Sequence, residues 1–329
     1  MFEMIIMDYL KSFPHITRED IDFLKGCCWS PHDPKLYCAR FKIINNQLYH
    51  CGEMHHNGRL HTMKQLFLET LDVHTISNCE FVLFYDDAIN ESNIHKITKD
   101  KIMPLIVCTS VLDKYNCILC PDFTFSTFPQ FKITDHELLC NELVDSCFST
   151  KIPKLIYKGD MSAHTRRERV RYVRKDSLYD CEHYDIESDN HTTFLSRKDR
   201  NQYKYYLHLN GRHGDAYSSA LKYGLCNSVV FYSSAVLYRE FWQHPSIFKQ
   251  GEHYVYTRTP EELDERLNYY VEHEEEAEKI AMQAEIFFKT FLWKKKTIYH
   301  YIQLLFNEYA KRMTYQPVIH YTDQLLSKV

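Results

Sequence analysis

Residues 79–87 read Cys-Glu-Phe-Val-Leu-Phe-Tyr-Asp-Asp, an apolar run closed by two carboxylates. A short run of this kind, rich in aromatic and aliphatic side chains, predicts a strand that is buried on both faces. A second such run, Pro104-Leu105-Ile106-Val107-Cys108, follows further along the chain. Two buried strands joined by a crossover are typical of a parallel sheet covered by helices, so the sequence predicts an α/β fold. Asp86 and Asp87 then lie at the carboxyl end of the first strand.

Three further elements are expected upstream of this strand. Thr17 followed by Asp20 resembles a capping box and predicts the start of a short helix. Residues 39–49 alternate loosely between apolar and polar, with Asn45-Asn46 as a turn, which predicts a hairpin. An apolar stripe over residues 61–71 predicts a helix.

The second half of the chain repeats the alternation of strands and helices. Strands are expected at residues 154–157, 203–209 and 228–232, and helices at residues 218–225, 261–292 (with a break near His273) and 298–312. With a seam near residue 150, this pattern predicts two Rossmann-like domains. The first spans residues 1–150 and the second residues 151–296, and the C-terminal residues 297–329 are expected to pack back on the first domain.

The composition excludes several classes of protein. The chain has 329 residues and a formal net charge of −4, so its overall field does not attract nucleic acid. No apolar segment approaches the roughly 18 to 20 residues of a membrane span, and the N-terminus lacks the basic region of a secretory signal. The 12 cysteines are scattered, which favours reduced thiols over disulfides. We therefore expect a cytoplasmic protein without a transmembrane segment.

Polar residues follow three of the predicted strands: Asp86-Asp87, Lys158-Gly159-Asp160 and Asn210-Gly211-Arg212. In open α/β sheets, ligands bind outside the carboxyl ends of the strands. A glycine directly after a strand lets the backbone approach a ligand closely, and free amides at a helix start favour a phosphate. A strongly basic helix is expected from Arg166 to Arg174, and its guanidinium groups suit a diphosphate. The alternative for these arginines is a solvated basic helix face.

Three blocks of the second half stand out as motifs. They are Tyr157-Lys158-Gly159 with Ser162 and Arg166; Tyr203 to Gly211 with Ser218-Ser219-Ala220-Leu221-Lys222 and Ser228 to Phe231; and Tyr238 to Trp242 with His253-Tyr254-Val255. These blocks resemble the protein O-glucosyltransferase and capsule-associated xylosyltransferase family, glycosyltransferase family 90. In the first half, residues 79–87 resemble the family's strand ending in the catalytic aspartate, and Pro121 to Phe125 resembles its Pro-x-(Trp/Phe)-x-Phe element. The likeness spans most of the chain.

The resemblance implies a GT-B fold, in which two Rossmann-like domains with parallel sheets face a central cleft. It also implies inverting transfer of a sugar from a UDP-sugar to a hydroxyl of a glycan or glycoprotein, with no metal and no other cofactor. Asp87 matches the family's catalytic base; the alternative is Asp86, otherwise a strand-end carboxylate that caps the next turn. Phe123 and Phe125 are expected to contact the acceptor. The expected donor-binding residues are Lys158, Gly159, Asp160, Ser162, Arg166, Asn210, Gly211, Arg212, Ser218, Ser219, Lys222 and Glu240.

Two positions depart from the family's pattern. Lys158 stands where the family has an arginine, which keeps the charge but loses the bidentate geometry. Ala220 stands where a second arginine is usual, and Arg212 in the preceding loop is our candidate for the missing guanidinium. Glu240 is expected to bond ribose or sugar hydroxyls, and the alternative is an acid on a helix surface.

Four other patterns are interpreted as structural. Asp20-Ile21-Asp22 has the Asp-x-Asp spacing of metal-dependent transferases, but it lies in the expected first turn of a helix, where the dipole favours carboxylates. The pair Cys117 and Cys120 has no second cysteine pair at zinc-site spacing. Cys51, His55, His56 and His61 are interpreted as part of a surface hairpin. The run Trp293-Lys294-Lys295-Lys296 is interpreted as a solvated helix junction.

Three functional hypotheses follow. The leading one is an enzyme that transfers xylose in preference to glucose, in the cytosol of a microbial or virus-infected host cell. The rival is a catalytically weakened member of the family that binds a sugar or nucleotide; Lys158 and Ala220 favour it, whereas the retained Asp87 disfavours it. The third is a nucleotide-dependent enzyme of another GT-B family, with a different base.

Overall fold

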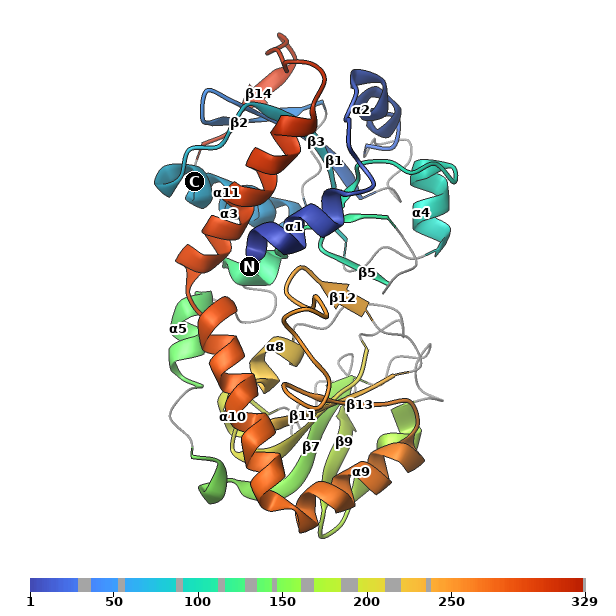
Figure 1. Ribbon diagram of the computed structural model, residues 1–329, viewed down its shortest axis with the longest axis vertical. Coiled ribbons are helices and arrows are strands. Elements are labelled where there is room, and N and C mark those ends of the chain that lie inside the picture. Colours follow the sequence, from blue (N-terminus) through green and yellow to red (C-terminus); the bar gives the residue numbers. More distant parts are fainter. Residues whose placement is uncertain are drawn as a thin grey trace. The chain divides into compact units, whose positions relative to one another are not determined.

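The computed structural model describes residues 1–28, 37–52, 57–86, 91–111, 116–127, 135–143, 147–160, 169–184, 195–210, 220–234 and 238–327. These residues form helices and two six-stranded sheets, both of which contain parallel strand pairs (Figure 1). The predicted α/β class is therefore confirmed. The chain divides into two compact units: unit 1 comprises residues 1–136, 239–244 and 295–329, and unit 2 comprises residues 137–238 and 245–294.

The sheet of unit 1 is mixed. Its strand order is β14-β2-β1-β3-β4-β6, with β1 at Cys38–Ile44, β2 at Gln47–Cys51, β3 at Cys79–Phe84, β4 at Ile106–Val107, β6 at Ile118–Leu119 and β14 at Asp323–Leu325. Strands β3, β4 and β6 are parallel, as residues 79–85 and 104–108 predicted. Strands β1, β2 and β14 add antiparallel pairs. The prediction of a parallel sheet is thus wrong for half of the strands, because the hairpin joins the same sheet through β3.

The β1–β2 hairpin confirms the prediction for residues 39–49. Asn45 and Asn46 form its two-residue turn with φ angles of 52° and 61°, a left-handed conformation that asparagine tolerates. The Asn46 side chain donates to the Leu71 carbonyl at 2.9 Å and accepts from the Ile76 amide at 3.0 Å. These bonds tie the turn to the segment that leads into β3.

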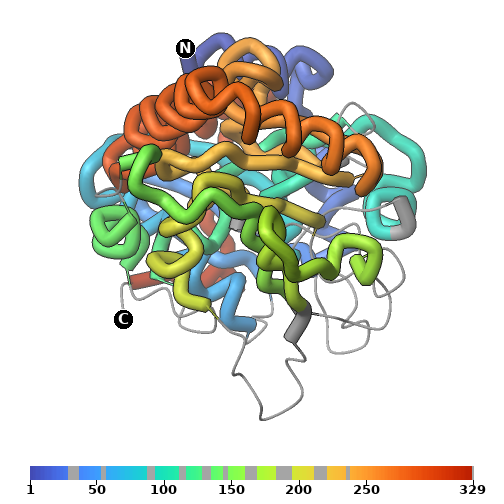
Figure 2. Tube along the Cα trace, turned by 90° about the horizontal axis from the view of Figure 1, so that it is seen from below, coloured from blue at the N-terminus to red at the C-terminus, as the bar shows by residue number. Residues whose placement is uncertain are grey.

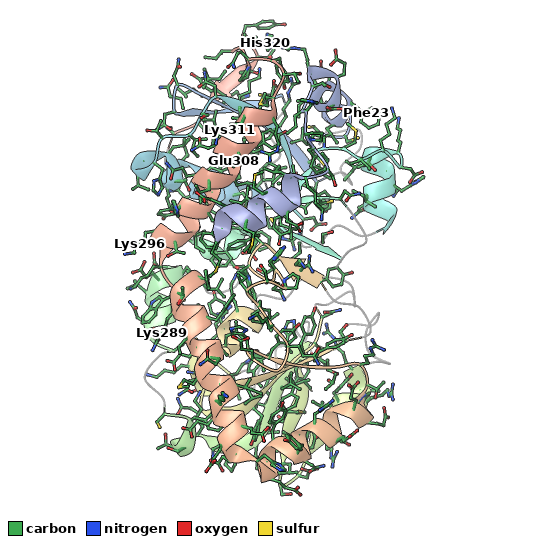
Figure 3. The ribbon with its side chains drawn as sticks, viewed as in Figure 1. Phe23, Lys289, Lys296, Glu308, Lys311 and His320 are labelled. Atoms are coloured by element: carbon green, nitrogen blue, oxygen red, sulfur yellow. The ribbon has the colours of Figure 1, made fainter. Side chains whose placement is uncertain are left out.

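Unit 1 also contains α-helices and a 3₁₀ turn. They are α1 (Phe2–Leu10), α2 (Arg18–Lys25), α3 (Gly58–Val73), α4 (Glu91–Thr98), the 3₁₀ turn η1 (Phe123–Phe125) and α11 (Lys295–Arg312). Helix α2 begins with the predicted capping box of Thr17 and Asp20. Helix α11 packs against α1, α3 and β3. Glu308 and Lys311 form an ion pair on this helix (Figure 3).

Aromatic rings fill the core between the sheet and the helices of unit 1. Phe41 of β1 stacks on Phe81 of β3 with 5.6 Å between ring centroids. Phe67 of α3 and Phe306 of α11 close over Phe81 from the helical side, at 5.7 and 4.3 Å. The apolar faces predicted for these helices therefore meet one buried strand pair.

One segment of the second half belongs to unit 1. Strand β12 (Tyr238–Glu240) pairs with β5 (Thr109–Val111) in a two-stranded sheet, and residues 239–244 are assigned to unit 1. The Phe241 ring lies 5.5 Å from Phe125 and 4.5 Å from Tyr301. The third motif of the second half is thus shared between the two units.

The sheet of unit 2 is doubly wound. Its order is β13-β11-β10-β7-β9-β8, with β7 at Ile152–Asp160, β8 at Arg174–Lys175, β9 at Tyr179–Tyr184, β10 at Tyr203–His208, β11 at Val229–Ser233 and β13 at Val255–Thr257. All pairs except β8–β9 are parallel. Counted along the chain, the parallel strands have the spatial order 2-1-3-4-5. The order reverses between β7 and β10, which is the topological switch point where such sheets bind ligands.

The helices of unit 2 include those that the sequence predicts at residues 218–225 and 261–292. They include α5 (His136–Asn141, whose first residue belongs to unit 1), α7 (Arg197–Arg200), α8 (Ala220–Gly224), α9 (Pro260–Glu272) and α10 (Glu274–Phe291), with 3₁₀ turns η3 (Phe148–Thr150) and η4 (Val170–Tyr172). The break at His273 is confirmed. The helix predicted from Arg166 to Arg174 is confirmed only in part: its described residues are helical at Arg169 and in the turn η4, whereas Arg174 starts β8, which pairs with β9. Arg174 also binds Asp176 at 2.6 Å and Asp264 at 3.1 Å.

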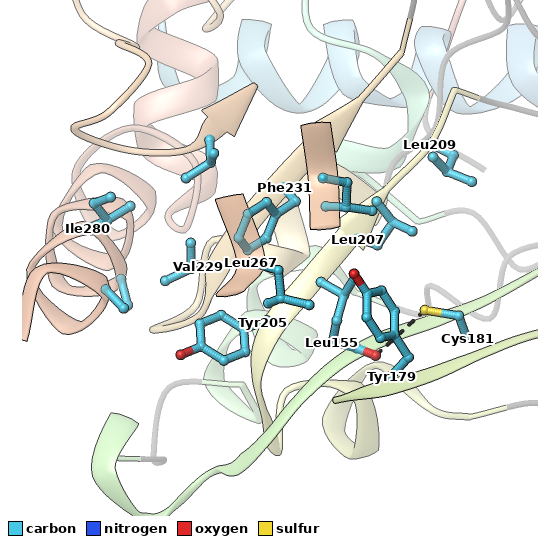
Figure 4. Close-up of a cluster of buried hydrophobic side chains, with 14 of the residues drawn as sticks. Leu155, Tyr179, Cys181, Tyr205, Leu207, Leu209, Val229, Phe231, Leu267 and Ile280 are labelled. Atoms are coloured by element: carbon cyan, nitrogen blue, oxygen red, sulfur yellow. Dashed lines mark hydrogen bonds between the residues drawn. The ribbon is translucent and has the colours of Figure 1, made fainter. Parts of the chain in front are cut away.

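Helices α9 and α10 (orange in Figure 2) pack against the sheet of unit 2. Their side chains Leu267 and Ile280 complete a cluster with Tyr205, Leu207 and Phe231 of the central strands (Figure 4). The cluster extends to β9, where the Cys181 thiol donates to the Leu155 carbonyl at 3.6 Å. Because the strand pairs β7–β9, β7–β10, β10–β11 and β11–β13 are parallel, their carboxyl ends meet at one edge of the sheet.

All 12 cysteines lie in described residues and are free thiols, as predicted. No helix in the described ranges is long and apolar enough to cross a membrane.

Candidate active site

The carboxyl end of β3 carries the predicted catalytic pair. Asp87, the predicted base, lies outside the described residues. Asp86 forms an ion pair with the Arg59 guanidinium near the start of α3, and both side chains are about three quarters buried, with 24% and 25% exposed. Asp86 is therefore engaged by a cation from a neighbouring element.

The predicted acceptor residues lie in η1. Asp122 caps this turn, because its carboxylate accepts from the Thr124 amide at 2.8 Å. Phe123 and Phe125 are both buried, and Arg59 lies over the Phe123 ring at 5.6 Å from its centroid. In unit 1, Arg59 thus connects the acidic end of β3 with this aromatic turn. Arg59 is not recognisable as a site residue in the sequence, because a lone arginine in a helical stripe carries no motif.

Lys158 lies at the carboxyl end of β7, beside the switch point. Its ammonium group binds Asp180 at 2.8 Å and Glu182 at 2.6 Å, and its side chain is 5% exposed. Burial raises the pKa of Asp180, but hydrogen bonds from Lys158 and Tyr203 outweigh it, so that the pKa stays below its usual value. Hydrogen bonds from Lys158 and Lys175 lower the pKa of Glu182. The charge of Lys158 is therefore balanced by carboxylates of β9.

Gly159 has a packing reason for being glycine. A Cβ at this position would collide with the ring of Tyr157, two residues earlier on the same face of β7. The backbone of Asp160 completes β7 by pairing with Tyr184. From the sequence, Gly159 is explained only by close approach of a ligand, and the side-chain direction of Tyr157 reveals this second requirement.

Asn210 follows β10 on the other side of the switch point. Its amide donates to the Ser234 hydroxyl at 2.7 Å and accepts from the Tyr232 hydroxyl at 2.9 Å. Its backbone carbonyl accepts from the guanidinium of Arg169, which is buried. The structure therefore brings Arg169 to the carboxyl end of β10. In the sequence, Arg169 is only one member of the basic stretch 166–174, because side-chain direction is not visible in a run of arginines.

His208 lies two residues before Asn210 in β10. Burial, and next the nearby Arg169, lower the pKa of His208 to about 3, so the imidazole is neutral. Its Nδ1 is buried and has no hydrogen-bond partner within the described part of the chain. Its ring packs edge-on against Tyr232 at 4.7 Å.

Two further predicted donor residues are deeply buried. Lys222 in α8 is 0% exposed and lies 5.7 Å from the Tyr223 ring centroid. Glu240 is in β12 and is also buried, so its alternative placement on a helix surface is wrong. Its carboxylate accepts from the Trp242 indole at 3.0 Å. By contacts Glu240 belongs to unit 1, whereas Lys158, Asn210 and Lys222 belong to unit 2.

The remaining predicted donor residues fall outside the description: Ser162, Arg166, Gly211, Arg212, Ser218 and Ser219 have no described structure. The side chain of Asp160 is likewise not described.

Two of the patterns interpreted as structural have structural roles. Asp20 closes the capping box of α2, with its carboxylate 2.8 Å from the Thr17 amide. In the stretch 293–296, Lys294 pairs with Glu137 at 2.8 Å and Lys295 with Asp135 at 2.6 Å. Figure 3 labels Lys296, the last residue of this stretch, and Lys289 on α10. Lysines 294 and 295 are thus neutralised within the protein.

The sheet of unit 2, with basic and amide side chains at its switch point, defines a doubly wound α/β protein of the kind that binds ligands at strand ends. The family model of glycosyl transferase family 90 matches residues 32–328, nearly the whole chain. The chain belongs to this family, so the resemblance drawn from the motifs is confirmed, and it is a glycosyltransferase that acts on a sugar donor and an acceptor. No individual curated protein is similar enough to add to this finding.

Proposed function

We propose that this glycosyltransferase takes its sugar from a UDP-sugar and transfers it, with inversion and without a metal ion, to a hydroxyl of a glycan or glycoprotein. The observation that carries the donor assignment is the switch point between β7 and β10, where Lys158 and Asn210 lie and where Arg169 is bound. We further propose that the two units correspond to the acceptor and donor domains of a GT-B enzyme, unit 2 holding the donor.

The proposed donor site relies on cations and amides. A leaving UDP develops negative charge, which fixed positive groups stabilise in a site with little water. Arg169 is held at the switch point by its bond to the Asn210 carbonyl. Among the predicted residues, Arg166 and Arg212 would add guanidinium groups, and Gly211, Ser218 and Ser219 would add backbone amides and hydroxyls. Glu240 remains our proposal for a hydroxyl of the sugar or ribose.

The proposed chemistry assigns the proton to Asp87. Its carboxylate takes the proton of the acceptor hydroxyl while that oxygen forms a bond to the anomeric carbon of the sugar. The bond from this carbon to the diphosphate oxygen breaks, and UDP leaves with the electron pair. A positioned general base contributes roughly 10² to 10⁴ in rate. We propose xylose as the donor sugar in preference to glucose.

A second candidate is a sugar- or nucleotide-binding protein with weakened catalysis. The observation that favours it is the pairing of Lys158, since a lysine held by Asp180 and Glu182 presents less positive charge to a diphosphate than a free arginine.

The proposed location is the cytosol, of a microbial or virus-infected cell. The 12 free thiols support it, because such thiols persist in a reducing compartment. Mass spectrometry of the native protein should find neither disulfides nor N-glycans; either modification would contradict this location.

The test of the reaction is UDP release from a panel of UDP-sugars in the presence of EDTA. We expect turnover with UDP-xylose above UDP-glucose and loss of turnover in Asp87→Asn. Asp100→Asn is a matched control, because the Asp100 side chain is 76% exposed, and it should keep full turnover. A requirement for Mn²⁺, or full activity of Asp87→Asn, would refute the mechanism. UDP binding without turnover of any donor would favour the binding protein.

A further inference from the structure

A lysine takes the place of an apolar residue on the face of α3 that packs against the sheet of unit 1. Lys64 lies one helical turn after Leu60 and one turn before Phe67, and all three side chains are buried. Residues three and four apart share one face of a helix, so Lys64 belongs to this apolar stripe. Phe67 packs on Phe41 of β1 with 6.0 Å between ring centroids, which shows that the stripe faces the sheet.

Lys64 makes neither a hydrogen bond nor an ion pair with any residue that the structure describes, although only 8% of it is exposed. The other buried lysines of the described ranges all have a partner. Lys42 binds Asp323, Lys151 binds Asn201 and Ser228, Lys158 binds Asp180 and Glu182, Lys204 binds Glu274, and Lys222 lies near the ring of Tyr223. Buried charges are normally paired, so the exception at Lys64 calls for an explanation.

The positive charge of Lys64 persists at neutral pH. Burial lowers the pKa of Lys64 to about 8, and no carboxylate in the described part of the chain opposes this shift. At pH 7 the ammonium form therefore still predominates. Unit 1 thus contains a buried cation for which the described residues provide no counter-ion.

His50 of β2 lies on the same side of the sheet as α3. It pairs with Phe41 in the β1–β2 ladder, and its ring is edge-on to the Phe41 ring at 5.4 Å. Its Nδ1 is buried and has no hydrogen-bond partner within the described ranges. Burial, and next the charge of Lys64, lower the pKa of His50 to about 4, so the imidazole is neutral and lies near the ammonium group.

We propose that Lys64 and His50 form a binding site in unit 1 for an oxyanion, a phosphate or carboxylate group. The ammonium supplies the charge, and the neutral imidazole can place its one N–H on Nδ1. Charge-assisted hydrogen bonds to an anion are roughly twice as strong as neutral ones. An oxyanion satisfies both groups at once, because it balances the buried cation and gives the ring nitrogen an acceptor. Lys158 and Asn210 of the proposed donor site belong to unit 2, so this site is a second one.

The test follows the side-chain carbon-13 NMR signals of Lys64 and His50 at pH 7 while inorganic phosphate or glucuronate is added at constant ionic strength. We expect both signals to shift and to saturate. Tighter binding of phosphate would identify a phosphate group as the ligand, and tighter binding of glucuronate a sugar carboxylate. Lys64→Met should lower the affinity for the preferred anion at least about tenfold, since it removes the charge. His50→Leu should lower it by about threefold, since it removes one neutral donor.

Two controls separate this site from general effects of charge. Lys151 is also buried and its pKa is likewise lowered to about 8, but its ammonium group is bonded to three oxygen atoms at 2.9, 3.0 and 3.1 Å. Its signal should not move when either anion is added. Lys11→Met removes an exposed positive charge of unit 1 and should leave the affinity for both anions unchanged.

The stability of Lys64→Met gives a second measurement. A methionine suits the apolar stripe better than an unpaired cation, so without an added anion the variant should melt at a higher temperature than the wild type. Phosphate should raise the melting temperature of the wild type more than that of the variant. The proposal is overturned if neither anion shifts the Lys64 and His50 signals, if Lys64→Met binds both anions as tightly as the wild type, or if the variant without anion is the less stable protein.

Discussion

Lys158 at the carboxyl end of β7 offers the sharpest test of how the donor site works. Its ammonium group holds Asp180 at 2.8 Å and Glu182 at 2.6 Å, with side-chain exposures of 5%, 19% and 24% for the three residues. Breaking a fully buried ion pair costs about 3 to 5 kcal/mol. Because both carboxylates are partly exposed and keep bonds from Lys175 and Tyr203, we expect Lys158→Met to lower the free energy of unfolding by about 2 kcal/mol at pH 7.

The pH dependence of this loss has a defined sign. The native pKa values of Asp180 and Glu182 are lowered in part by Lys158, so the stability they contribute is present above the unfolded pKa values near 4 and is lost as the pH falls below them. The difference in unfolding free energy between wild type and Lys158→Met should therefore be largest near neutral pH and shrink below about pH 4. Urea unfolding followed by circular dichroism at several pH values measures it.

The same variant tests the role of Lys158 toward the donor. Without Lys158, Asp180 and Glu182 lose their shared ammonium partner, and the added negative charge near the proposed diphosphate site should lower the affinity for UDP about tenfold, measured by calorimetry. The triple variant Lys158→Met/Asp180→Asn/Glu182→Gln removes those charges and should restore most of the affinity and of the stability. If its affinity for UDP stays as low as that of Lys158→Met, the reasoning is refuted and Lys158 contacts the diphosphate directly.

Three further predictions concern stability. Lys42→Met should lower the free energy of unfolding, measured with urea, by about 3 kcal/mol, because it leaves buried Asp323 and Glu80 without their ammonium partner. Lys11→Met, at an exposed pair, should lower it by less than about 0.5 kcal/mol. Equal losses in the two variants would contradict this expectation. Burial lowers the pKa of His208 to about 3, whereas a histidine in the unfolded chain binds its proton near pH 6.5. The free energy of unfolding should therefore fall as the pH drops from about 6.5 toward 4. In His208→Leu this fall should be less steep. Gly159→Ala should destabilise unit 2 by about 1 to 3 kcal/mol through its clash with Tyr157, and it should cost little when it is introduced into a Tyr157→Ala background.

Local patterns predicted many elements correctly. The hairpin at 39–49, the capping box at Thr17, the buried strand at 79–85 and the break at His273 all depend on neighbours within a few residues, and each is confirmed. The basic stretch from Arg166 was predicted as one helix up to Arg174, but its described part is helical only at Arg169 and in the 3₁₀ turn η4 and becomes a strand at Arg174. The conformation of this stretch depends on partners far along the chain, since residues 174–175 pair with β9 and Arg174 binds Asp264.

In the candidate site, too, local features could be predicted from the sequence and long-range contacts could not. Residue types at strand ends were visible in the sequence, so Asp86, Lys158 and Asn210 could be named in advance. Their partners could not, because an ion pair such as Arg59 with Asp86 joins residues 27 positions apart and depends on how α3 lies beside β3. The roles of Lys158 and Arg169 depend on such partners.

The sequence by itself determined the α/β class, the family membership through its motifs and the carboxylates at the end of β3, because these features are carried by contiguous runs of residues. The tertiary structure decided the mixed sheet of unit 1, the switch point between β7 and β10, and which charged side chains balance one another. The physical reason is that strand order and ion pairing are set by long-range packing, which brings together residues that no local pattern links.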